Sequence, residues 1–180
     1  GCAMAVRAAM RDAGVPEAVI RQRVLLLDSR GLIVADRPGI SGHKQKLAVD
    51  PQTVASWGIS SSGRIDLNYT LPSFKPTVLF GCSGQPGTFT EHIIRTVHRG
   101  CDRPIILALS NPTKKIEATP EEILRWTDGK AVVGTGSPFA PVELGGRRFR
   151  IGQCNNSYIF PGVGLGAYVG KLRYVSDEMF

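Results

Sequence analysis

The chain has 180 residues, 42% of them hydrophobic and 21% charged, which are the proportions of an ordinary soluble domain with its own core. No apolar run is long enough to span a bilayer. The formal net charge of +7 is spread over scattered basic pairs and does not form the basic stripe typical of nucleic-acid binding. We therefore expect no membrane and no nucleic acid among its partners, and we interpret the charge as solubility plus attraction for an anionic ligand.

The first segment carries apolar residues at helical spacing and ends in a stop signal at Gly14. The apolar run VLLLD at residues 24–28 then predicts a short buried strand. A helix that leads into such a strand ending in an acid is typical of the second half of a βαβ dinucleotide-binding unit. We expect the first strand and most of the glycine loop to lie before residue 1. Asp28 would then bind the hydroxyls of the adenine ribose.

Cationic and hydroxyl side chains follow this acid. Ser29 and Arg30 are its neighbours, and Lys44 comes after a polar loop. A phosphate prefers charged partners with several donors, so these residues are candidate contacts for a 2′-phosphate. The alternative is that Arg30 and Lys44 are solvated surface charges.

The middle of the chain alternates between strand and helix signals. Asp50 and Pro51 predict a short helix start, residues 60–63 a loop, and the stretch to residue 76 an irregular excursion. Residues 78–80 predict a strand that runs into GCSGQPG, followed by a helix from Thr88. Glycines in that loop would let the backbone pass close to a bound nucleotide.

Further strands are expected at 104–109 and 131–133, with a helix between them that is capped at Thr119 and runs to about Thr127. Residues 142–149 predict a hairpin with Gly145 and Gly146 at its turn, and residues 151–154 an additional edge. The tail from Pro161 is expected to be helical.

Three asparagines stand just past apolar runs: Asn111, Asn155 and Asn156. An Asn side chain offers two donors and an acceptor, so it can hold a carboxylate, a hydroxyl or an amide. In an open α/β sheet such residues lie at the carboxyl edge, where ligands bind. Singly, each could be a simple turn former; together they favour a binding edge.

Three long motifs resemble the cofactor-binding domain of malic enzymes: LALSNPT (107–113), WTDGKAVVGTGSPFAPV (126–142) and GQCNNSYIFPG (152–162). The resemblance runs over nearly the whole chain. It implies a Rossmann-like, doubly wound α/β fold with a mostly parallel sheet that lacks its first strand. It also implies a single NAD(P)-binding domain over residues 1–180, truncated at both ends.

The resemblance implies roles for individual residues. Lys44, three residues before Leu47 and Ala48, matches the lysine that marks NADP preference in the family. The asparagines would contact substrate and nicotinamide, and Gly1 would be the last glycine of GxGxxG. The residues expected to bind cofactor are Gly1, Asp28, Ser29, Arg30, Lys44, Cys82, Ser83, Gly84, Leu109, Ser110 and Asn111, and those expected to bind substrate are Asn111, Asn155 and Asn156.

The implied activity is oxidative decarboxylation of malate to pyruvate and CO2, with NADP favoured over NAD. A malolactic-type NAD enzyme and a non-catalytic nucleotide-binding module are the alternatives. Family members place their catalytic Tyr and Lys, and the ligands of Mg²⁺ or Mn²⁺, upstream of the glycine loop. We therefore assign no catalytic and no metal-binding residue in this chain, and we expect it to be inactive alone.

The resemblance further implies a homodimer or homotetramer. The four cysteines show no zinc spacing and are interpreted as reduced thiols of an intracellular protein, so we expect the cytoplasm, with mitochondrion or plastid as alternatives.

Overall fold

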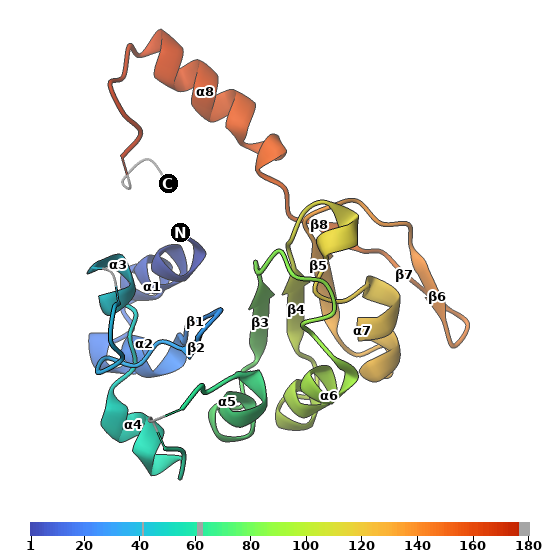
Figure 1. The fold of residues 1–180 in the computed structure, drawn as a ribbon. Coiled ribbons are helices and arrows are strands. Elements are labelled where there is room, and N and C mark those ends of the chain that lie inside the picture. The colour runs from blue at the N-terminus through green and yellow to red at the C-terminus, as the bar shows by residue number, and fades with distance from the viewer. Residues whose placement is uncertain (41, 61–62, 177–180) are drawn as a thin grey trace. The chain divides into compact units, whose positions relative to one another are not determined.

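The computed structural model describes residues 1–40, 42–60 and 63–176. Contacts within the chain divide it into two compact units. Unit 1 comprises Gly1–Thr77 and Thr90–Pro104, and unit 2 comprises Val78–Phe89 and Ile105–Phe180. Figure 1 labels the helices and strands of both.

Unit 1 is mainly helical, and its helices begin and end at residues with recognisable caps. Asp50 accepts a hydrogen bond from the Gln52 N–H and Thr90 from the Ile93 N–H, while Gly14, with φ of 78°, follows the end of the first helix. The helices are α1 (Cys2–Asp12), α2 (Glu17–Arg23), α3 (Gly42–Gln45), α4 (Pro51–Ser56), α5 (Leu67–Phe74) and α6 (Glu91–Gly100). The predicted starts near Asp50 and Thr88 are thus correct to within a few residues.

The segment at residues 24–28 differs from its prediction. Only β1 (Leu27–Asp28) is a strand, and it pairs antiparallel with β2 (Gly31–Leu32) in a two-stranded ribbon. The chain reverses because Gly31 has φ of +98°, and a Cβ there would lie 2.6 Å from the Ile65 carbonyl oxygen. The prediction of a strand over residues 24–28 was therefore wrong in extent, and its place in a βαβ unit with a strand before residue 1 stays a prediction.

The core of unit 1 forms around that ribbon. Leu32, Val34, Val49, Val54 and Ile65 are all at most 5% exposed. Helix α5, which packs against α6, was not predicted, although Asp66 caps it by accepting from the Asn68 N–H. Part of the loop predicted at residues 60–63 lies outside the described residues.

Unit 2 is built on a parallel sheet of four strands. These are β3 (Val78–Gly81), β4 (Ile105–Ala108), β5 (Val132–Thr135) and β8 (Gly152–Gln153), in that spatial order. Helix α7 (Pro120–Trp126) packs against β5 and starts at a capping box, in which Thr119 and Glu122 satisfy each other's backbone N–H groups. The sheet confirms the predicted Rossmann-like α/β fold, and the strand predicted at 151–154 is the edge strand β8.

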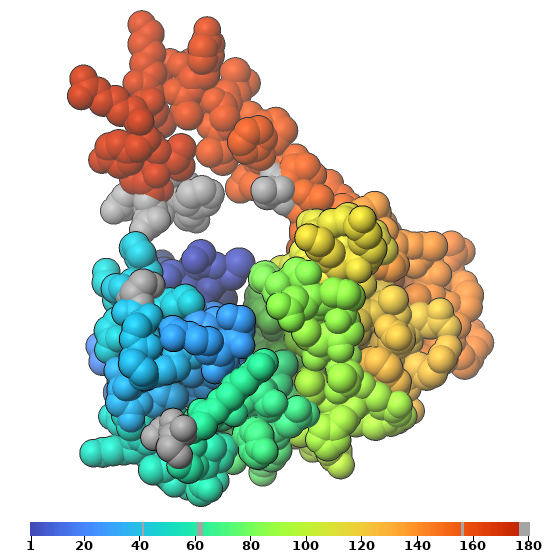
Figure 2. Space-filling view, in the orientation of Figure 1, coloured from blue at the N-terminus to red at the C-terminus, as the bar shows by residue number. Residues whose placement is uncertain are grey.

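The remaining elements of unit 2 also follow the sequence signals. Gly145 and Gly146, with φ of +57° and +73°, form the turn of the predicted hairpin between β6 (Val142–Leu144) and β7 (Arg147–Phe149). Single 3-10 turns occur at η1 (Thr113–Lys115) and η2 (Asn156–Tyr158). The predicted tail helix is α8 (Phe160–Val169), drawn in orange in Figure 2, and its side chains of Phe160, Leu165, Tyr168 and Val169 are exposed. None of the helices in the described part of the chain has the length and apolarity to cross a membrane.

Candidate cofactor-binding site

The loops that carry the predicted ligand contacts of unit 2 leave neighbouring parallel strands at the same edge of the sheet. Because β3, β4, β5 and β8 all run in one direction, their carboxyl ends meet there. The polar residues that follow these strands are Ser83, Ser110, Asn111, Ser137 and Asn155.

Asn111 is a predicted contact that is exposed at the sheet edge. Its Oδ1 accepts a hydrogen bond from the buried Ser137 hydroxyl at 2.5 Å. Its amide group has no acceptor among the described residues, and the residue is exposed. Gly136 lets the β5 loop pass this close, because a Cβ there would lie 2.3 Å from the Leu109 carbonyl oxygen. Asn111 therefore holds two donor hydrogens at the sheet edge for a carbonyl or hydroxyl of a ligand.

Asn155 makes its hydrogen bonds within the protein. Its Nδ2 donates to the Gly136 carbonyl at 3.3 Å, and its Oδ1 accepts from the Ser157 N–H at 2.9 Å. It is thus a turn former that also joins the β8 loop to the β5 loop, and its contact with substrate stays a prediction. The backbone of Asn156 begins η2, but its side chain lies outside the described part of the structure.

A buried glutamate beneath the edge was missed from the sequence. Glu117 is 0% exposed, and its Oε1 accepts from the Ser83 N–H at 2.8 Å, the Ser83 hydroxyl at 2.8 Å and the Ser110 hydroxyl at 2.5 Å. Its Oε2 accepts a longer bond, 3.4 Å, from the Ser110 N–H. The Ser110 hydroxyl in turn accepts from the Gly84 N–H at 2.8 Å. One carboxylate therefore connects the loops that follow β3 and β4.

Two opposing effects set the protonation of this group. Burial raises the pKa of the Glu117 carboxyl, but the hydrogen bonds from Ser110 and Ser83 together outweigh it and hold the pKa below its usual range. The carboxylate is consequently the stable form at neutral pH. Room for it comes from Gly81 at the end of β3, where a Cβ would lie 2.6 Å from the Glu117 Cδ.

In unit 1 the structure brings Asp28, the Arg30 backbone and Lys44 together and adds Arg37. Arg37 binds both oxygens of Asp28, at 3.1 and 2.7 Å, and Lys44 Nζ lies 2.6 Å from Oδ2. The Arg30 backbone N–H donates to Oδ1 at 2.9 Å. Partial burial raises the pKa of Asp28, but these donors outweigh it and hold the pKa well below its ordinary value.

Arg37 also anchors the turn that carries Asp28, since its guanidinium donates to the carbonyls of Gly31 and Leu32 at 3.0 and 3.1 Å. The Arg30 side chain instead donates to the backbone at Pro38 and Gly39.

The other predicted contacts lie as follows: Ser29 is exposed beside Asp28, Gly1 is the N-cap of α1, Cys82 is exposed after β3, and the Leu109 N–H donates to the Gly81 carbonyl at 2.8 Å.

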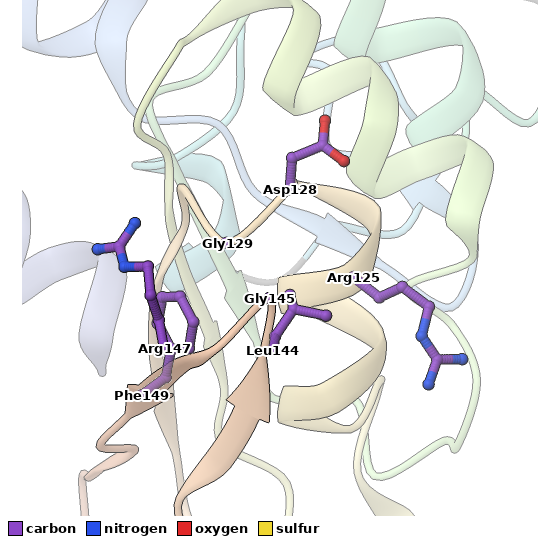
Figure 3. A pocket seen from close by; sticks show the side chains of 7 residues that line it. All are labelled: Arg125, Asp128, Gly129, Leu144, Gly145, Arg147 and Phe149. Atoms are coloured by element: carbon purple, nitrogen blue, oxygen red, sulfur yellow. The ribbon is translucent and has the colours of Figure 1, made fainter.

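A shallow pocket of about 350 Å³ lies between α7 and the β6–β7 hairpin (Figure 3) and contains none of the predicted site residues. Arg147 stacks on the Phe149 ring at 5.2 Å, and its charged group points away from that of Arg125. The two cations therefore do not converge on one anion. Among residues 1–40, 42–60 and 63–176, no three His, Cys, Asp or Glu side chains gather as a metal site.

An open polar edge on a parallel sheet, together with an anchored acid on the turn after a helix, defines the class of α/β domains that bind dinucleotides. Comparison with known proteins narrows the class. All of residues 1–180 match the family described as "Malic enzyme, NAD binding domain". The chain belongs to this family.

Several longer proteins are similar in sequence to this chain. The chain is 49% identical over 179 residues to an NAD-dependent malic enzyme of Shewanella woodyi, and 46% identical over 181 residues to one of Sodalis glossinidius. An NAD-dependent malic enzyme of Acinetobacter baylyi is 45% identical over 181 residues. Each alignment covers 99% of this chain but 32% of the relative, so the chain spans about a third of the length of these proteins.

Proposed function

We propose that the full-length protein containing this chain oxidises and decarboxylates malate to pyruvate and CO2 with NAD, and that this chain supplies the cofactor-binding domain. The observation that carries the proposal is the open amide of Asn111 at the carboxyl edge of the β3-β4-β5-β8 sheet, in a chain of the malic enzyme family. The names of the relatives support NAD as the cofactor.

In this proposal each unit has its own contacts with the cofactor. NAD, when bound, would supply the hydride acceptor for the oxidation of malate at C2. Asn111 orients the nicotinamide carboxamide or the substrate through its amide donors, with Ser110 and Leu109 beside it. Asp28 accepts from the hydroxyls of the adenine ribose. The chain thus contributes binding and orientation, and the proton transfers belong to residues outside it.

The geometry of Asp28 bears on the choice between NAD and NADP. A carboxylate has about four acceptor positions, and four donors already occupy those of Asp28. Lys44, with a side chain 41% exposed, is the donor that can leave most easily. A ribose 2′-hydroxyl could then take its place on Oδ2, whereas a 2′-phosphate would bring two negative charges beside the carboxylate.

NADP is the second candidate, and the cationic surroundings of Asp28 favour it. Lys44 could turn from Asp28 to a 2′-phosphate, and the Arg37 guanidinium would still neutralise the acid. The sequence alone favoured this cofactor; the names of the relatives lead us to propose NAD as the main one.

The decisive experiment is a malate assay of the full-length protein with NAD and NADP in turn, in the presence of Mg²⁺ or Mn²⁺. We expect NADH, pyruvate and CO2 in equal amounts, and a kcat/KM at least about tenfold higher with NAD, equivalent to about 1.4 kcal/mol. Lactate without net NADH would instead indicate malolactic chemistry, and binding of NAD without turnover of malate a nucleotide-binding module.

Metal, assembly and location complete the proposal. The residues that the structure describes offer no metal site, so Mg²⁺ or Mn²⁺ would be held elsewhere in the full-length protein. We propose a homodimer or homotetramer in the cytoplasm, testable by light scattering and by cell fractionation. The 180 residues alone are expected to oxidise no malate.

A further inference from the structure

Glu117 stands out because a fully buried carboxylate is held entirely by neutral donors. Its four hydrogen bonds come from two hydroxyl and two backbone N–H groups of Ser83 and Ser110. Burying a charge is unfavourable unless its hydrogen bonds compensate. An apolar residue in its place would leave the donors of Ser83 and Ser110 without this acceptor, so the carboxylate has a role beyond filling space.

The contacts of the Glu117 carboxylate indicate what this role is. All four bonds go to the second residue after β3 and the second residue after β4, and none goes to another element of the described sheet. Through the Ser110 hydroxyl the connection extends to the Gly84 N–H. Asn111, whose amide is open, is the next residue along the chain from Ser110. Glu117 therefore fixes where both loops begin.

We propose that Glu117 is a positioning residue for the nicotinamide half of the dinucleotide: it ties the Ser83–Gly84 loop to Ser110 and thereby sets the position of Asn111. The proposal rests on the proposed function, because it takes Asn111 as the contact for nicotinamide or substrate. It assigns no chemical step to Glu117. We assign the adenine half to the Asp28 cluster of unit 1, which consists of Asp28, Arg37 and Lys44. Binding of the adenine half should not depend on Glu117.

The test begins with Glu117→Gln in the full-length protein. An amide has one acceptor oxygen, so with that oxygen in place of Oε1 the bond from the Ser110 N–H to Oε2 is lost. The three bonds to Oε1 are weakened, because the charge of the acceptor is removed. The matched control is Glu121→Gln on α7, because Glu121 is exposed and pairs only with Arg125 in the described structure. Ser83→Ala is a milder second variant that removes one hydroxyl donor and leaves the carboxylate in place.

Hydrogen exchange of the ligand-free protein tests the tie between the loops. Glu117→Gln should speed exchange at the Ser83, Gly84 and Ser110 amides by about tenfold or more, the loss expected for a hydrogen bond to a charged group. Ser83→Ala should give a smaller increase, and Glu121→Gln none. Amides of the core strands, such as those of Ile106 and Val133, should keep their rates. Unchanged exchange at the three loop amides in Glu117→Gln would overturn the proposal.

Binding of two ligands separates positioning from a general loss of stability. NADH contains both halves of the dinucleotide, and ADP-ribose lacks the nicotinamide. Glu117→Gln should raise the Kd for NADH about tenfold and leave the Kd for ADP-ribose within about twofold. Equal weakening of both ligands would overturn the positioning role. If the unmodified protein binds neither ligand, the proposed function fails, while the exchange measurement still decides whether Glu117 ties the loops.

Discussion

Two carboxylates, one in each compact unit, accept four hydrogen bonds each, but from donors of different kinds. Asp28 in unit 1 is bound by the guanidinium of Arg37, the ammonium of Lys44 and one backbone N–H. Glu117 in unit 2 is bound by hydroxyls and backbone N–H groups. The Asp28 side chain is 17% exposed, whereas Glu117 is fully buried.

The difference separates a site that can exchange partners from one that cannot. Lys44 is partly solvated and can leave Asp28, because water then replaces part of what the ammonium loses. Glu117 is fully buried, so breaking its bonds leaves the carboxylate unsatisfied in the interior. We therefore expect the Asp28 cluster to adapt to a ligand and the Glu117 cluster to act as a fixed support.

The largest effect is expected for Glu117→Ala. The substitution removes the only described acceptor of the Ser83 N–H and leaves a cavity under the sheet edge. Local protection of the amides at the ends of β3 and β4 should fall by about 3 kcal/mol. Hydrogen exchange of the full-length protein measures this, with Glu121→Ala as the exposed control. A loss of protection below about 1 kcal/mol would show that the Glu117 carboxylate is not needed to hold these two loops.

Asp28→Asn is expected to have the next largest effect. The amide cannot accept from both nitrogens of Arg37 and from Lys44, and it leaves two neighbouring cations without their counter-charge. Protection of the Leu32 and Ile33 amides should fall by about 2 kcal/mol. The Kd for ADP-ribose should rise while the Ser83 and Ser110 amides keep their exchange rates. Loss of protection in both units would contradict the separation of the two clusters.

Acid should affect the Asp28 cluster in a defined direction. The pKa of Asp28 is lowered in the folded chain, so its ionised form stabilises the fold fully above the unfolded value of about 3.9. That stabilisation is lost as the pH falls through the lower folded-state pKa. Between pH 5 and pH 3, protection at Leu32 and Ile33, corrected for intrinsic exchange, should decrease by about 1 kcal/mol. Asp28→Asn should remove this part of the pH dependence.

The sequence predicted what depends on local rules and missed what depends on distant partners. The capping box at Thr119 and the hairpin glycines at 145 and 146 were readable, because a few adjacent residues specify each structure. The strand predicted at 24–28 was too long. The chain turns back at Gly31, where only a glycine fits against the Ile65 carbonyl, and Ile65 lies far along the chain.

The same reason explains which parts of the site could be predicted. Asp28 and Lys44 were named as candidate contacts because an acid after an apolar run and a cation beyond a polar loop are visible in the sequence, but their ion pair was not predicted. Glu117 was missed because its partner Ser83 lies 34 positions away and its neighbours mark only a helix start. The available signal in the sequence was its pair of apolar neighbours, Ile116 and Ala118, which are both buried in the structure.

Lys44→Gln should change cofactor choice more than stability. The Lys44–Asp28 pair is partly exposed, so its loss should cost only about 0.5 kcal/mol of local stability. If Lys44 only neutralises Asp28, kcat/KM with NAD should stay within about twofold. Residual activity with NADP should fall about tenfold, because the phosphate loses a cation. A selective rise in NADP use would contradict the role of Lys44 in attracting phosphate.

Arg30→Ala is expected to have the smallest effect and tests which part of Arg30 matters. Its backbone N–H binds Asp28, and this donor survives the substitution. Among the described residues its exposed side chain reaches only the carbonyls of Pro38 and Gly39, at 3.4 and 3.2 Å, so stability should change by no more than about 0.5 kcal/mol. Kinetics with NAD should also be unchanged, and Arg30→Pro, which removes the N–H, is the matched contrast. A strong loss of NADP use in Arg30→Ala alone would mean that the guanidinium leaves these carbonyls for a 2′-phosphate. Both Arg30 and Lys44 would then change partners when the cofactor binds beside Asp28.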